Sequence, residues 1–138
     1  MCLSRIKKRF ITEDDIICYK IVKKINNNYR SKFYNFPYKI GETYESKIVD
    51  NFEYRWTGID YVLSPTVEKA LHSYKHLVNA KMALKERYEG GGSKLTILKC
   101  IIPKGSECYE GMFYQYINYD YYAFESYASD TIKIIEEI

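Results

Sequence analysis

Two histidines four residues apart, His72 and His76, are the first residues of this sequence whose types and spacing suggest chemistry. On a helix, side chains at positions i and i+4 lie on one face and can hold a metal ion between them. The three residues between them include no glutamate that would serve as the base of a zinc hydrolase. We interpret the histidines as a solvated pair on the exposed face of a helix, and we predict no metal site.

The cysteines and the carboxylates offer no better catalytic arrangement. None of the four cysteines has the Cys-x-x-Cys spacing of a zinc or redox motif, and nothing in the sequence places one beside a histidine. Cys18 and Cys100 lie in strand-like runs, which favours a role as small core residues. Glu136 and Glu137 are adjacent on a predicted strand, so they point to opposite faces. We therefore predict no catalytic residue.

The glycine-rich segment 89–93 precedes Lys94 and invites comparison with a phosphate-binding loop. Such a loop follows a strand and opens a helix, with Lys-Ser/Thr after the glycines. Here the glycines leave a predicted helix and enter a predicted strand. We interpret the segment as a linker and predict no cofactor.

Tyrosine is the unusual component, with 16 residues against six phenylalanines and one tryptophan. Codon bias in an AT-rich genome explains such a composition, but a recognition surface does as well, because tyrosine combines a rigid apolar ring with a polar tip. The densest segment, 109–127, also carries Asp120 and Glu125 but no lysine or arginine, which argues against binding a nucleic-acid backbone. A loop folded on its own core is the alternative. The predicted binding residues are Trp56, Tyr114, Tyr116, Tyr119, Tyr121 and Tyr122.

The length of 138 residues predicts a single domain, 1–138. Short β-branched runs predict strands at 16–23, 95–102 and 131–138, with 95–102 central because it is apolar on both faces. The turn at Pro103-Lys-Gly105 ends that strand, and 107–112 is expected to return beside it as a hairpin. The pattern over 113–124 is too irregular to assign.

One long helix is expected from Ser64 to about Tyr88. Ser64 is a suitable N-cap, Pro65 suits the first helical position, and three glycines at 90–92 would end the helix. Apolar residues between them recur at about 100° per residue. The predicted fold class is therefore α+β, with one long helix packed on a mixed, mostly antiparallel sheet.

The order of several short motifs resembles a small uncharacterised domain of bacteriophage and bacterial proteins, which also occurs behind pentapeptide repeats. The motifs are Tyr19-Lys20, 38–42 (YKIGE), 58–62 (GIDYV), 64–71, 98–105 (LKCIIPKG) and Ala128-Ser-Asp130. Asp60 stands where that family's pattern has histidine. The resemblance implies a phage-type protein and supplies no activity.

The Ile-Pro-Lys-Gly turn before a final strand also looks distantly like the ADP-ribosyltransferase fold. Those enzymes place a catalytic glutamate in a Glu-x-Glu pattern at the start of the last conserved strand. The matching place here is Asp130-Thr131-Ile132, and Tyr19-Lys20 stands where an early arginine or histidine is expected. The resemblance therefore implies the fold more than the activity.

These observations lead to one main hypothesis and two rivals. The main one is a non-catalytic, phage-type binding module that acts on a host or virion protein or sequesters a small ligand. The first rival is an ADP-ribosyltransferase-like enzyme using NAD, and the second is a nucleic-acid binder using the basic residues 5–9. No apolar leader or span of about 18 apolar residues is present. We therefore expect a cytoplasmic protein without a membrane partner, in the host cytoplasm if it is phage-encoded.

Overall fold

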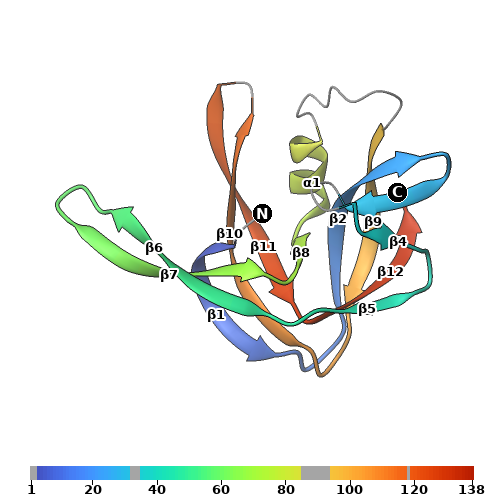
Figure 1. Ribbon diagram of the computed structural model, residues 1–138, viewed down its shortest axis with the longest axis horizontal. Coiled ribbons are helices and arrows are strands. Elements are labelled where there is room, and N and C mark those ends of the chain that lie inside the picture. Colours follow the sequence, from blue (N-terminus) through green and yellow to red (C-terminus); the bar gives the residue numbers. More distant parts are fainter. Residues whose placement is uncertain (1–2, 32–34, 85–93, 118) are drawn as a thin grey trace.

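The computed structural model describes residues 3–31, 35–84, 94–117 and 119–138, and within them the fold is built almost entirely of β-strands (Figure 1). The strands are β1 (Ser4–Ile11), β2 (Ile16–Ile25), β3 (Asn28–Ser31), β4 (Pro37–Tyr38), β5 (Thr43–Glu45), β6 (Val49–Trp56), β7 (Tyr61–Lys69), β8 (Leu71–Tyr74), β9 (Lys94–Ile102), β10 (Glu107–Ile117), β11 (Asp120–Ser129) and β12 (Thr131–Glu137). The one helix of the described residues, α1, covers Leu77–Ala83.

Ten strands form one sheet in the order β1-β10-β11-β8-β2-β9-β12-β5, with β3 beside β2 and β4 beside β3. The long pairing of β2 with β9 places Cys18 opposite Cys100. On its other edge β9 pairs with β12, so it lies inside the sheet, as its apolar sequence predicts. The predicted strands at 16–23, 95–102 and 131–138 correspond to β2, β9 and β12.

The main core lies on one face of these central strands. Its fully buried members are small or branched residues that alternate along each strand, which is the period expected of a strand with one buried face. They include Cys18, Val22, Leu98, Cys100, Ile102, Cys108, Ile132 and Ile134. The predicted core role of Cys18 and Cys100 is confirmed.

The prediction of an α+β fold with a long helix is wrong. Ser64 and Pro65 lie inside β7, residues 71–74 form β8, and the helix is only seven residues long. Proline is tolerated in β7 because that strand is paired with β6 alone at Pro65, so a missing N–H breaks no second ladder. Which residues of this segment are buried depends on the strands that pair with it, and a helical repeat of apolar residues in the sequence cannot reveal those partners. The predicted helix end and the glycines at 90–92 lie outside the described residues.

The strand β10 is also placed differently from the prediction. It does not return beside β9 but pairs with β1 on one edge and β11 on the other. The unassigned segment 113–124 belongs to a regular hairpin of β10 and β11, in which Phe113 faces Phe124 and Tyr116 faces Tyr121. The predicted turn at Pro103–Gly105 is confirmed, with Gly105 at a φ of 88°.

The strands β6 and β7 form a separate two-stranded sheet that projects from the main sheet (Figure 1). We call residues 50–66 of this hairpin the arm. Near its base, the backbone of Val67 exchanges two hydrogen bonds with that of Leu3, and these anchor β7 to the start of the chain. No helix within the described ranges is long and apolar enough to cross a bilayer.

Candidate functional site

A pocket of about 1060 Å³ opens beside the arm's base, and it is the larger of the two best-formed concavities among the described residues. Its walls come from β2, β3, β4, β5, β6, β7, β8 and β10, which can be followed in Figure 1. Small-molecule sites are usually concave, largely apolar and a few hundred to about 1,000 Å³ in volume. This pocket therefore has the size and the lining of a ligand site.

One side of the pocket is aromatic. Phe36 and Tyr38 enter it from β4 and the segment before it, and their ring centroids lie 5.2 Å apart. Three more aromatic residues of the lining, Phe113, Tyr114 and Tyr116, come from β10. Aromatic walls of this kind can stack on the faces of a planar ligand.

The polar end of the pocket contains Lys20, from β2. Its Nζ donates a hydrogen bond to the backbone carbonyl of His72 and lies 5.4 Å from the centroid of the Tyr38 ring. An ammonium group carries three donors, so Lys20 can bond to an anionic ligand while it keeps the bond to β8. Lysine is a common partner of phosphate and carboxylate groups.

His72 lies beside Lys20 and is not the solvated residue that the sequence predicts. It belongs to β8, and both ring nitrogens are buried without a hydrogen-bond partner among the described residues. The Glu68 backbone carbonyl is close enough to favour the charged ring slightly, but it lies outside hydrogen-bond geometry. Burial and, next, the positive charge of Lys20 lower the pKa of His72 to about 3. At neutral pH the ring therefore offers one donor and one acceptor.

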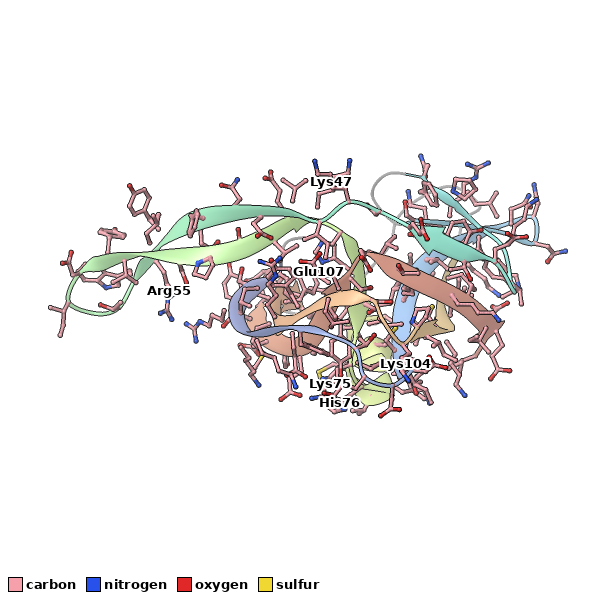
Figure 2. All side chains as sticks on the ribbon, turned by 90° about the horizontal axis from the view of Figure 1, so that it is seen from below. Lys47, Arg55, Lys75, His76, Lys104 and Glu107 are labelled. Carbon is pink, nitrogen blue, oxygen red and sulfur yellow. The ribbon has the colours of Figure 1, made fainter. Side chains whose placement is uncertain are left out.

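His76 lies apart from this site. It precedes α1 as its N-cap and pairs with Glu125, its Nε2 lying 3.0 Å from Oε2 of that carboxylate. Figure 2 shows His76 next to Lys75, which bonds to Glu110 at 2.8 Å. The described residues contain no cluster of three or more His, Cys, Asp or Glu side chains that could hold a metal ion.

The five predicted tyrosines all lie on the β10–β11 hairpin, but only two of them reach the pocket. Tyr114 and Tyr116 line it. Tyr119 and Tyr121 lie toward the hairpin's end, where they are 90% and 79% exposed. Tyr122 stacks on Phe124, with the ring planes 5° apart, and so supports the core.

Trp56, the other predicted binding residue, lies at the end of β6 on the arm. Its ring packs against that of Tyr61, with the ring centroids 5.0 Å apart. Among the described residues, it makes no ring contact with the β10–β11 tyrosines. The predicted binding residues therefore do not form one site, because they are divided among the pocket, the end of the β10–β11 hairpin, the core and the arm. Asp60 belongs to the turn between β6 and β7, where its carboxylate accepts a bond from the amide of Tyr61.

Asp130, at the position compared with the catalytic acid of ADP-ribosyltransferases, is not among the residues that line the large pocket. It lines a second pocket of about 380 Å³ together with Arg9, Glu107 and Tyr109. Its carboxylate accepts a hydrogen bond from the Glu107 amide and another from the Thr131 hydroxyl. Asp130 thus stabilises the turn into β12.

The sequence offered one indication that Lys20 has a polar role, and this indication was not used in predicting the site. Lys20 is a single charge within the apolar run Ile16–Val22, and such a residue needs a polar reason to lie in a strand beside a core. Nothing in the local sequence predicts its neighbour His72, which lies 52 positions later. Comparisons of the chain with protein-family models, curated proteins and solved structures found no match.

Proposed function

We propose that this chain is a non-catalytic module that binds and sequesters a small, planar, negatively charged molecule of the nucleotide class in the large pocket. The proposal rests on one observation: the side chains of Lys20 and His72 line the same pocket as several aromatic rings. The Lys20 ammonium supplies positive charge, and the buried His72 ring has no hydrogen-bond partner among the described residues. A buried polar group without a partner is costly, and a bound ligand would supply one.

The chemistry of the pocket fits each part of such a ligand. Phe36, Tyr38 and the β10 aromatics would stack on the base. The Lys20 ammonium would bind the phosphate. The neutral imidazole of His72 would exchange hydrogen bonds with a polar edge, because its low pKa keeps one nitrogen free to accept.

The binding test is calorimetric titration with NAD, cyclic nucleotides, nucleoside monophosphates and the matching neutral nucleosides. We expect the phosphorylated members to bind and the nucleosides to bind more weakly. Lys20→Gln removes the charge and should raise the Kd at least about tenfold, since charge-assisted hydrogen bonds are the strong ones. Lys104→Gln is the matched control, because Lys104 is exposed, carries the same charge and does not line the pocket (Figure 2).

Two results would overturn the proposal. One is the absence of binding by every phosphorylated compound at millimolar concentration. The other is binding that Lys20→Gln and Lys104→Gln weaken equally, which would place the ligand elsewhere. Chromatography of the NAD samples tests the non-catalytic part, because released nicotinamide would instead support an ADP-ribosyltransferase-like enzyme.

A further inference from the structure

The arm carries an apolar face that no other part of the described chain covers. Side chains alternate across a strand, and residues directly opposite each other share a face. Three consecutive cross-strand pairs on one face are apolar: Phe52 with Pro65, Tyr54 with Leu63, and Trp56 with Tyr61. The four aromatic members are between 56% and 77% exposed.

The opposite face of the arm is polar. Its cross-strand pairs are Asn51 with Thr66, Glu53 with Ser64, and Arg55 with Val62. Figure 2 shows Arg55 below the arm's ribbon, on the side where β1 lies. The two remaining carboxylates near the arm's base are engaged, because Asp50 accepts a bond from Tyr109 and Glu68 accepts one from Asn51. By the same alternation Asp50 shares the apolar face at its end next to the main sheet, and the three pairs from Phe52–Pro65 to Trp56–Tyr61 carry no charged side chain.

We propose that the apolar face of the arm docks on the same face of a second copy of this chain and forms a two-fold symmetric dimer. This inference is independent of the pocket and its ligand. A two-stranded hairpin alone is marginally stable in water, and a second ribbon packed face to face would supply the missing layer. The centres of protein interfaces are depleted in charge and enriched in aromatic residues, as this face is.

A second copy suits this surface better than a partner of other chemistry for two reasons. A two-fold axis near the Tyr54–Leu63 pair brings identical apolar residues together, and Glu53 and Arg55 of both copies remain on the outer faces. The area is also sufficient. If each fully exposed aromatic side chain offers about 200 Å², the four of one arm present roughly 500 Å². Two arms present about 1,000 Å² before Leu63 and Pro65 are added, which approaches the size of a specific interface.

The test is the mass of the full chain in solution, measured by sedimentation velocity from about 1 to 100 µM. We expect a dimer that dissociates on dilution. The variant Tyr54→Ser/Leu63→Ser removes the central apolar pair and should raise the dimer Kd at least roughly 100-fold, because both copies lose central contacts. Arg55→Ser/Val62→Ser is the matched control, since it changes the next cross-strand pair on the opposite face. It should leave the dimer intact.

Far-UV circular dichroism and the melting temperature of the monomeric form establish that each variant is folded. Either of two outcomes contradicts the proposal. A wild-type chain that stays monomeric at 100 µM would assign the face to a partner of another kind. Equal effects of the two double variants, or none, would place the dimer contact away from this face.

Discussion

The ammonium group of Lys20 donates a 2.5 Å hydrogen bond to the backbone carbonyl of His72, joining β2 to β8 at the polar end of the large pocket. These strands have only one paired position, Tyr19 with Tyr74, so the side chain reinforces a short ladder. Lys20→Met keeps the aliphatic stem and removes the donor. We expect it to lower the free energy of unfolding by about 1–2 kcal/mol. Urea denaturation measures this loss, and an unchanged midpoint would show that the bond contributes nothing.

His72 should make the protein less stable in mild acid. Its folded-state pKa, lowered to about 3, lies below the unfolded value near 6.5, so between these values the unfolded chain binds more protons. Stability should fall as the pH drops below 6.5, by up to about 1.4 kcal/mol per pH unit. Denaturant unfolding at pH 7, 6 and 5 measures the slope.

The matched variants for this prediction are His72→Gln and His76→Gln. The first should flatten the slope between pH 6.5 and 5, because glutamine does not titrate. The second changes an exposed histidine outside the pocket and should leave most of the slope. A slope that persists in His72→Gln and disappears in His76→Gln would mean that His72 is not the responsible group.

Glu137 should act at lower pH than His72. Its carboxylate accepts bonds from Lys24 at 2.7 Å, Tyr29 at 2.7 Å and Thr96 at 2.8 Å, and these bonds, that of Lys24 first, lower its pKa to about 2. The stabilisation is present above the unfolded value near 4.5 and is lost as the pH falls toward 2. Because the side chain is 27% exposed, we expect Glu137→Gln to cost only about 1–2 kcal/mol at pH 7.

The neighbouring exposed residue provides the control for Glu137. Glu136→Gln removes the same charge one position away and should change the free energy of unfolding by less than about 0.5 kcal/mol. Thermal unfolding at pH 7 and pH 3 compares the two variants. Equal melting temperatures for both at pH 7 would contradict the role of the three bonds.

Gly111 should not tolerate a side chain. A Cβ atom there would lie 2.7 Å from the backbone oxygen of Ser4 and 3.2 Å from that of Arg5, so β1 must move to admit it. We expect Gly111→Ala to destabilise the protein by about 1–3 kcal/mol. Hydrogen exchange should show the loss first in the amides of β1. Wild-type protection of β1 in this variant would mean that the strand shifts without cost.

The three described cysteines should be unreactive in the folded protein. Burial, the largest effect in each case, raises the pKa of Cys18 to about 11 and those of Cys100 and Cys108 to about 12, so the thiolate is scarce at neutral pH. In a Cys2→Ser background, a thiol-specific reagent should label none of them until denaturant is added. Rapid labelling of one thiol under native conditions would show that its strand opens easily.

Strand pattern and turn chemistry were the predictable part of this fold. β2, β9 and β12 are recognisable because runs of β-branched residues leave few alternatives, and Gly105 marks a turn that its backbone conformation confirms. The prediction of a long helix failed because Ser64-Pro65 has the composition of a helix start. In the structure, Pro65 instead pairs with Phe52 of another strand. Whether such a segment forms a helix or a strand depends on its pairing with distant segments, and a short stretch of sequence holds no information about that pairing.

The sequence drew attention to aromatic residues, but it did not predict which of them line the candidate pocket. The density of tyrosines drew attention to β10, from which Tyr114 and Tyr116 line the pocket. Trp56 was grouped with them by type alone, although it lies on the arm. His72 was missed because its place in the fold depends on the pairing of β8 with β11 and with β2, two strands far from it in the sequence.

The pairing of β2 with β9 has a consequence for how the chain reaches its native state. Cys18 meets Cys100 only after the intervening segment, which supplies β3 to β8 and the helix, has been brought into a closed loop. Closing long loops costs entropy before any contact compensates for it, so topologies rich in such pairings fold slowly. The sheet's centre is therefore expected to form late, after local hairpins such as β10–β11.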